Sequence, residues 1–128
     1  MPFDQTVSLG TFFVEDNFTI RENLVATLKE LVEINYLGYA ETEAAGIGWL
    51  TRSENAWDVA IVDIFFQQGS GLGILAACKN RLPHQHVIVL SNYATPDVRK
   101  RCKELGADAV FDKSNDIDSL LEYCANVF

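Results

Sequence analysis

The chain has 128 residues, of which 48% are hydrophobic and 22% are charged, so it can bury one substantial core and is not a disordered polypeptide. Its formal net charge of −8 at pH 7 argues against nucleic acid or an anionic membrane surface as a direct partner. No apolar run is long enough to span a bilayer and no signal-peptide pattern opens the chain, so we expect a cytoplasmic protein.

Three cysteines lie far apart in the sequence, at Cys78, Cys102 and Cys124. No Cys-x-x-Cys pair and no cysteine/histidine cluster is present, which argues against a zinc site. Each cysteine falls on or beside the apolar stripe of a predicted helix. We therefore expect all three to be small buried hydrophobic side chains.

Strands and helices are predicted to alternate from the start of the chain. A strand is expected at about residues 11–15. The sequence of a capping box at 19–22, followed by apolar residues at helical spacing, predicts a helix that continues to about Asn35. Gly38 is expected to stop this helix, and residues 39–43 are predicted to form a short strand at or near a sheet edge.

The middle of the chain is less regular. Residues 44–56 predict a weak or mobile helix, because Gly46 and Gly48 each cost about 1 kcal/mol relative to alanine. The run at 59–63 is continuously apolar up to its final aspartate, which is typical of a strand buried on both faces of a parallel sheet. Three glycines at 69–73 could form a phosphate cradle, but no Gly-x-x-x-x-Gly-Lys pattern accompanies them.

The second half of the chain repeats the alternation of helix and strand. A helix is predicted to start near Leu72 and end before Pro83, and a strand follows at 87–90. The next helix has Thr95 as N-cap, Pro96 at its first position and Gly106 at its close. A strand at 108–111 and a helix from about Asp116 complete the chain. The pattern predicts an α/β fold. Its doubly wound, five-stranded parallel sheet would have the flavodoxin-like order 2-1-3-4-5 and helices on both faces.

Polar side chains follow four of the predicted strands, at the edge where their carboxyl ends meet. Glu15 and Asp16 follow the first strand, Asp63 ends the third, Ser91 follows the fourth and Lys113 follows the fifth. Three carboxylates in one crevice repel each other unless a hard cation such as Mg²⁺ lies among them. The alternative is that the two aspartates only begin helices, but this leaves the lysine and the hydroxyl unexplained.

From about Thr11 to its end, the chain resembles a response-regulator receiver domain. The residues that carry this resemblance are the acidic pair Glu15 and Asp16, Asp63 at the phosphoacceptor position, Gly71 at the loop glycine, Ser91 at the hydroxyl position and Lys113 at the position of the family's lysine. Each match is weak alone. Together, in this order and on these elements, they are specific.

The resemblance implies that Asp63 accepts a phosphoryl group from a sensor histidine kinase or a histidine phosphotransfer protein. It implies Mg²⁺ as cofactor, held by Asp16, Asp63 and the carbonyl of Phe65, with Glu15 acting mainly through metal-bound water. Lys113 and the hydroxyl at Ser91 would contact phosphoryl oxygens. Such a protein catalyses at most its own phosphorylation and slow dephosphorylation, so it is not an ordinary enzyme.

The chain departs from the family's pattern at several positions. The first acid of the pair is Glu15, Asn92 follows the hydroxyl where a small residue is usual, and Ser114 replaces the proline that favours a cis peptide. Val110 stands where many members have a switch aromatic, and Phe111, the next residue, is expected to face the other way. These two residues therefore depart from the inward rotation of a ring behind the hydroxyl that the family's pattern implies.

Two aromatic residues are placed to affect how long a phosphoryl group would last. Phe65 and Tyr93 lie two residues beyond Asp63 and Ser91, which in this family flank the path of the hydrolytic water. The bulky rings are expected to exclude water and slow hydrolysis. The alternative is that both rings simply face solvent or a partner.

We expect one receiver domain over 1–128, with a polar lead-in over 1–10 and no attached output domain. Its signal would then pass to a target protein through the face formed by the fourth helix, fifth strand and fifth helix, or the phosphoryl group would be relayed onward. The alternative is an interaction module on the same fold that is never phosphorylated, which Mg²⁺ binding would distinguish. A phosphohydrolase of the Asp-x-Asp type is disfavoured, because Phe65 occupies the place of its second aspartate.

Overall fold

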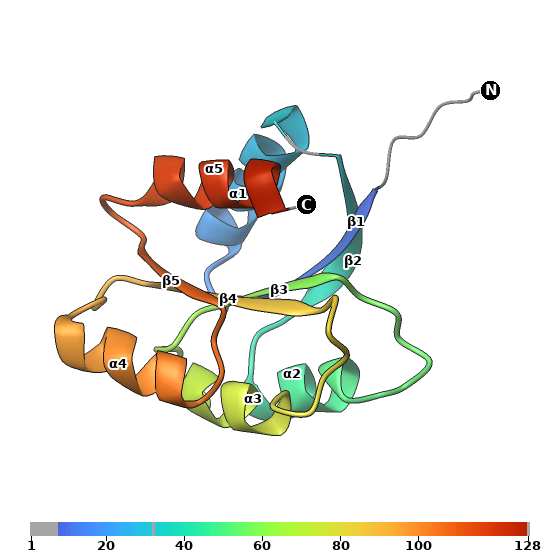
Figure 1. The fold of residues 1–128 in the computed structure, drawn as a ribbon, viewed down its shortest axis with the longest axis vertical. Helices are drawn as coiled ribbons and strands as arrows, with labels where there is room; N and C mark the ends of the chain where they lie inside the picture. The colour runs from blue at the N-terminus through green and yellow to red at the C-terminus, as the bar shows by residue number, and fades with distance from the viewer. Residues whose placement is uncertain (1–7, 32, 128) are drawn as a thin grey trace.

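A parallel β-sheet lies between two layers of helices in the computed structural model, which describes residues 8–31 and 33–127 (Figure 1). The elements are β1 Leu9–Val14, α1 Phe18–Leu31, β2 Ile34–Ala40, α2 Glu43–Leu50, β3 Val59–Val62, α3 Gly71–Ala77, β4 His86–Ser91, α4 Pro96–Glu104, β5 Ala109–Asp112 and α5 Ile117–Val127. The five strands have the order β2-β1-β3-β4-β5, and all pairs are parallel. The predicted fold class and strand order are confirmed.

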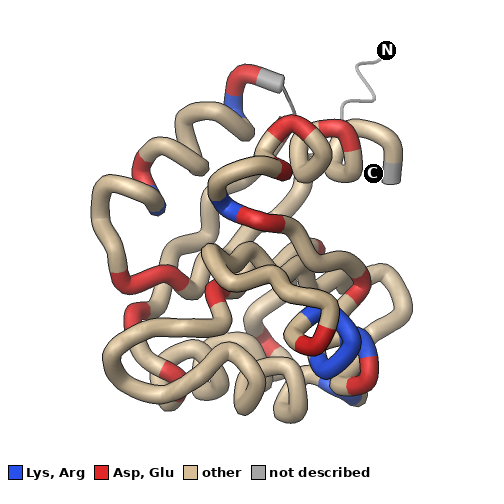
Figure 2. Tube along the Cα trace, turned by 90° about the vertical axis from the view of Figure 1, so that its left-hand side faces the viewer, with Lys and Arg blue, Asp and Glu red and all other residues tan. Residues whose placement is uncertain are grey.

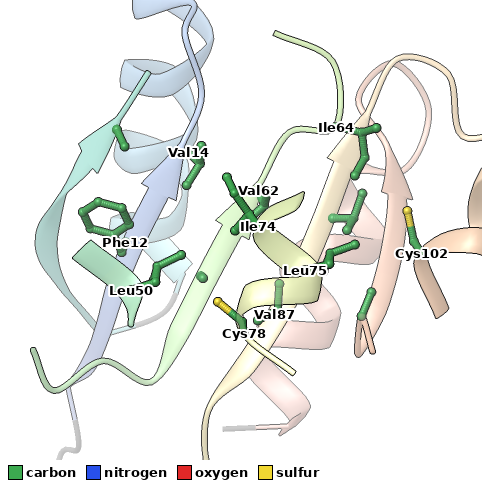
Figure 3. Close-up of a cluster of buried hydrophobic side chains, with 14 of the residues drawn as sticks. Phe12, Val14, Leu50, Val62, Ile64, Ile74, Leu75, Cys78, Val87 and Cys102 are labelled. Carbon is green, nitrogen blue, oxygen red and sulfur yellow. The ribbon is translucent and has the colours of Figure 1, made fainter. Parts of the chain in front are cut away.

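Hydrophobic side chains fill the space on both faces of the sheet. Helices α1 and α5 cover one face, and α2, α3 and α4 cover the other (Figure 1). Figure 3 shows the second of these layers, where Val14 and Val62 from the strands lie close to Ile74 of α3, and Phe12 lies close to Leu50 of α2. Every residue of β1 and β3 is buried, as expected for central strands covered on both faces.

The first helix begins and ends earlier than predicted. Asn17 caps α1, because its side-chain oxygen accepts a hydrogen bond of 2.9 Å from the backbone N–H of Ile20, and Thr19 lies inside the helix. The predicted capping box at 19–22 is therefore wrong. Strand β1 begins at Leu9, so the expected lead-in extends too far, and its residues 1–7 lie outside the described part of the chain.

The second strand also lies earlier than predicted, at Ile34–Ala40 instead of 39–43. Gly38 does not stop a helix: it lies inside β2 with a positive φ of 133°, where the pairing with β1 shifts register. The helix thus ends before Asn35, which lies in β2 and pairs with Gly10 of β1. Thr42, expected in the strand, is the N-cap of α2.

The predicted helix after β2 is present, although it is shorter than expected and ends at Leu50. Its two glycines differ in their surroundings. A Cβ at Gly46 would come within 3.0 Å of Ile74 and 3.3 Å of Val14, whereas a Cβ at Gly48 would meet nothing within 4 Å. Gly46 therefore allows close packing of α2 on α3 and the sheet, which offsets its low helix propensity.

The second half of the chain agrees closely with its predicted elements. Thr95 caps α4, with its hydroxyl oxygen 3.2 Å from the backbone nitrogen of Val98, and Gly106 follows the helix with a φ of 100°. All three cysteines are buried and unpaired, as predicted. Within the described residues, no helix combines the length and hydrophobicity needed to cross a membrane.

Candidate functional site

The predicted site residues meet at the carboxyl edge of the sheet. Asp63 directly follows β3, Ser91 is the last residue of β4, and Lys113 directly follows β5. Glu15, Asp63 and Ser91 are all buried, with 4%, 5% and 0% of their surfaces exposed. The parallel order of the strands therefore brings together side chains that lie far apart in the sequence.

Lys113 bridges two buried carboxylates. Its Nζ lies 2.6 Å from Oε1 of Glu15 and 3.2 Å from Oδ2 of Asp63. Burial opposes the charge of the lysine, but the hydrogen bond to Glu15 and the negative charges of both carboxylates outweigh it and raise the pKa of Lys113. The lysine is thus a fixed positive charge at the floor of the site.

Asp63 is a buried carboxylate with an unusually high proton affinity. Burial raises its pKa from 3.8 to about 6, the negative charge of Glu15 acts in the same direction, and Lys113 acts against both. The ionised form still predominates at pH 7. A cation bound beside Asp63 would lower the pKa of this carboxyl group and relieve its repulsion with Glu15.

Three carboxylates form a cluster that can hold a cation. One oxygen from each of Glu15, Asp16 and Asp63 lies within 4.8 Å of the others. Glu15 and Asp63 are buried, and Asp16 is partly exposed, which leaves one side open to solvent. Carboxylate oxygens are hard ligands that suit a divalent cation of the calcium or magnesium kind.

The loops after β1 and β3 position these carboxylates. The backbone N–H of Asn17 donates to Oε2 of Glu15 at 3.0 Å, and that of Gln67 donates to Oδ2 of Asp16 at 3.0 Å. The N–H of Phe65 donates to Oδ1 of Asp63 at 3.3 Å. The carbonyl of Phe65 as a metal ligand stays a prediction.

Ser91 presents a completely buried hydroxyl beside this cluster. Its oxygen accepts a hydrogen bond of 3.0 Å from the backbone N–H of Tyr93. Its carbonyl accepts one of 2.9 Å from the backbone N–H of Lys113, which joins the ends of β4 and β5. A serine hydroxyl can also donate one hydrogen bond, so a role for Ser91 in holding an anion stays a prediction.

The sequence matches the response regulator receiver domain over residues 11–125, which is most of the chain. The chain belongs to the response-regulator receiver domains. This is a family of two-component signalling whose members interact with kinases or phosphotransfer proteins. A comparison with curated proteins gave no match.

Solved structures of the same fold agree. The receiver domain of the putative response regulator NarL from Mycobacterium tuberculosis is 20% identical, with a TM-score of 0.76 over 93% of this chain and 98% of that one. A DNA-binding response regulator of the LuxR family from Staphylococcus aureus is 20% identical, with a TM-score of 0.80 over the same shares. A response regulator from Burkholderia pseudomallei, with a phosphorylated aspartic acid and a calcium ion, is 20% identical, with a TM-score of 0.72 over 89% of this chain and 65% of that one.

The receiver's glycine-rich loop surrounds a carboxylate of the protein itself. Oε1 of Glu43 accepts a hydrogen bond of 2.8 Å from the backbone N–H of Ser70, and a Cβ at Gly69 or Gly73 would overlap the Glu43 side chain. A Cβ at Gly71 would overlap the carbonyl oxygen of Asp63. The glycines therefore permit close packing against Glu43 and the backbone of Asp63. No space remains between them for a bound phosphate, which agrees with the absence of a nucleotide-loop pattern.

Arg21 is a positioning residue that the sequence reasoning missed. One of its guanidinium nitrogens donates to the carbonyl of Glu15 at 2.8 Å and lies 3.2 Å from Glu41, while the guanidinium stacks 3.7 Å from the ring centre of Tyr39. Only 2% of Arg21 is exposed. Because Arg21 lies three residues before Leu24, it places a charge in the buried stripe of α1. A charge on a buried helix face is the sequence feature that could have identified this residue.

The departures from the receiver pattern have visible consequences. Val110 belongs to the cluster beneath α2–α4, whereas Phe111 packs on the α1–α5 side, where its ring centre lies 5.8 Å from that of Tyr123. The expected opposite orientation of the two residues is thus confirmed. Among the described residues no peptide bond is cis, so the peptide before Ser114 is trans, and Asn92 is exposed.

Phe65 and Tyr93 contact each other at the rim of the site. Their ring centres lie 5.4 Å apart with an interplanar angle of 89°, an edge-to-face arrangement. Phe65 is 50% exposed and Tyr93 is 64% exposed. The pair therefore joins the loops after β3 and β4 across the edge where the carboxylates lie.

Proposed function

We propose that this receiver accepts a phosphoryl group on Asp63 from a histidine kinase or histidine phosphotransfer protein, with Mg²⁺ as cofactor. The observation that carries the proposal is the placement of one lysine between two buried carboxylates, with a third carboxylate near them and a buried hydroxyl at the end of the neighbouring strand. The phosphorylated aspartic acid and calcium ion of the Burkholderia pseudomallei structure support it.

The residues of the chain have separate tasks in this transfer. A carboxylate oxygen of Asp63 attacks phosphorus, and the bond from phosphorus to the donor histidine nitrogen breaks, so the imidazole leaves. Nζ of Lys113 turns from Asp63 to a phosphoryl oxygen while it keeps its hydrogen bond to Glu15. The hydroxyl of Ser91 donates to a second phosphoryl oxygen.

The acidic cluster fits the cation that this chemistry needs. Asp16, Asp63 and the carbonyl of Phe65 would hold Mg²⁺, and Glu15 would contact it through water. The ion would supply positive charge against the phosphoryl oxygens. Burial and the negative charge of Glu15 raise the pKa of Asp63, and the positive charge of the ion would act against both.

The aromatic pair at the rim is proposed to protect the phosphoryl group. Phe65 and Tyr93 narrow the approach to Asp63 from solvent, so a hydrolytic water reaches the acyl phosphate less often. The signal is proposed to leave through the face formed by α4, β5 and α5. There Arg99 donates to the carbonyls of Ala94 and Val110 at 2.9 and 2.8 Å, so the loop that follows Ser91 is tied to this face.

Calorimetric titration with Mg²⁺ tests this proposal against an interaction module that is never phosphorylated. We expect one ion per chain, and about tenfold weaker binding in Asp16→Asn, because a ligand carboxylate is lost. Asp118→Asn, which changes an exposed residue of α5, is the matched control and should bind like the wild type. Failure of the folded wild type to bind Mg²⁺ would favour the interaction module.

A further inference from the structure

A small apolar groove lies between α3 and α4, beside the loop that follows Asp63. Its volume is about 160 Å³, and it is lined by Ile64, Phe65, Leu72, Asp97, Val98 and Arg101. The apolar lining residues come from the loop after β3 and from both helices. The two charged lining residues, acidic Asp97 and basic Arg101, lie one helical turn apart on α4. The groove has room for one leucine- or phenylalanine-sized side chain.

The helix on one side of this groove carries a cluster of basic residues in a strongly acidic chain. Four of the ten basic residues of the chain lie within 99–103 of α4, although the net charge of the protein is −8. Figure 2 shows these residues as the largest gathering of blue on the tube. In the part of the chain that the structure describes, exposed Lys100 and Arg101 form no ion pair or side-chain hydrogen bond.

The groove is joined to the phosphorylation site through backbone hydrogen bonds. Phe65, which lines the groove, donates its N–H to Asp63, and its ring packs on that of Tyr93. The N–H of Tyr93 donates in turn to the hydroxyl oxygen of Ser91. Any phosphoryl group that engages Asp63 and Ser91 therefore acts on both loops that hold the aromatic pair in place.

We propose that this groove is a docking site for an acidic segment of a partner protein, which inserts one apolar side chain between α3 and α4 and places a carboxylate on Arg101. We further propose that phosphorylation changes its affinity, a coupling that rests on the proposed function. This surface differs from the face formed by α4, β5 and α5, because it is built from α3, α4 and the loop after β3.

Charge decides among the possible occupants. A second copy of the chain, packed through the same face, would set two basic helices against each other, and like charges disfavour such a contact. A nucleic acid matches the charge of α4 but is repelled by the rest of a chain of net charge −8, and it has no use for an apolar groove. An acidic peptide with one apolar anchor fits both features.

The test uses the whole protein with labelled methyl groups and a defined probe, an acetylated hexapeptide with one leucine among acidic residues. On titration, the methyl signals of Ile64, Leu72 and Val98 should shift and saturate. A peptide with alanine in place of the leucine should bind about fivefold more weakly, because the anchor is lost, and a peptide with lysines in place of the acids should not bind.

Variants locate the contact on α4. Arg101→Glu should weaken binding of the acidic peptide about fivefold or more, because it reverses a charge at the groove. Lys29→Glu makes the same charge change on α1, which lies on the other face of the sheet, and should bind within about twofold of the wild type. Equal affinity of Arg101→Glu and wild type, or saturable shifts confined to other methyl groups, or no binding, would overturn the proposal.

The coupling to the site is tested by repeating the titration with Mg²⁺ and beryllofluoride, which imitates a phosphoryl group. The peptide affinity should change by about threefold or more. An unchanged affinity, together with shifted signals around Asp63, would overturn the coupling alone. If beryllofluoride leaves the signals around Asp63 unshifted, the proposed phosphorylation fails, while the titration without it still decides whether the groove binds the peptide.

Discussion

Nζ of Lys113 lies 3.2 Å from Oδ2 of Asp63, although 50 residues separate them in the sequence. The lysine follows β5 and the aspartate follows β3, so only the order of strands in a parallel sheet brings them together. Both are largely buried, and both depend on Glu15 for the balance of charge. The pKa of Asp63 and the contribution of Lys113 to stability both depend on this contact.

Asp63→Asn should change how stability depends on pH. Since folding raises the pKa of Asp63 from 3.8 to about 6, the folded protein binds the extra proton between these values, and its free energy of unfolding falls as pH rises through the window. From pH 4 to pH 7, urea unfolding of the wild type should lose about 2–3 kcal/mol relative to Asp63→Asn. The exposed control Asp118→Asn should parallel the wild type, and parallel curves for Asp63→Asn would contradict the raised pKa.

Lys113→Ala should destabilise the protein at neutral pH. It leaves Glu15 and Asp63 buried without their cation, which typically costs about 3–5 kcal/mol. The loss should shrink towards pH 5, because the unpaired carboxylates then take up protons. Urea unfolding at both pH values measures the effect, with the exposed Lys100→Ala as control. A loss independent of pH would mean that packing, and not charge, is what the lysine supplies.

Two glycine substitutions of equal chemistry should have opposite effects. Gly71→Ala places a Cβ on the carbonyl of Asp63, and we expect a loss of about 3 kcal/mol or more, because backbone must move. Gly48→Ala, inside α2 and with nothing within 4 Å of the new methyl group, should gain up to about 1 kcal/mol. Thermal unfolding compares the two. A loss at position 48, or none at 71, would contradict the packing described.

The aromatic rim should lengthen the life of the acyl phosphate. Replacing both rings, as Phe65→Asn with Tyr93→Glu, opens the approach to Asp63, and we expect hydrolysis about tenfold faster. The rate is measured by the decay of phosphorylated protein after removal of the donor. Phe18→Asn, which removes another exposed ring, is the control. A wild type that hydrolyses faster than the double variant would refute the protective role.

Arg21→Ala should weaken Mg²⁺ binding without touching a ligand. The arginine holds the carbonyl of Glu15, so its loss frees the turn that carries Glu15 and Asp16, and we expect about three- to tenfold weaker binding. Calorimetry measures it, with the exposed Arg52→Ala as control. Unchanged Mg²⁺ affinity in a folded Arg21→Ala would limit this residue to a role in stability.

The sequence predicts the sheet, its order and the site because the informative residues lie at strand ends. The buried run before Asp63 and the cap at Thr95 depend on local chemistry, and both appear as predicted. The limits of α1 and β2 could not be predicted in this way. Gly38 has a positive φ at a shift of register within β2, a feature fixed by pairing with β1 and not by nearby residues.

Long-range packing also hid two parts of the site. Helical spacing places Arg21 on the buried stripe of α1, but its contacts with Tyr39 and Glu41 cannot be predicted from that spacing. The glycines at 69–73 resemble a cradle for a ligand until Glu43, the first residue of α2, is known to occupy the space between them. In both cases the partner is distant in the sequence, and no periodic pattern reports it.

Intact mass after incubation with acetyl phosphate tests the phosphoacceptor role of Asp63 most directly. Wild type, Asp63→Asn and the exposed control Asp118→Asn are compared with and without Mg²⁺. We expect one added phosphoryl group in wild type and control, only with Mg²⁺, and none in Asp63→Asn. A phosphoryl group that Asp63→Asn still gains, or a folded wild type that gains none, would contradict the assignment of Asp63 as the phosphoacceptor.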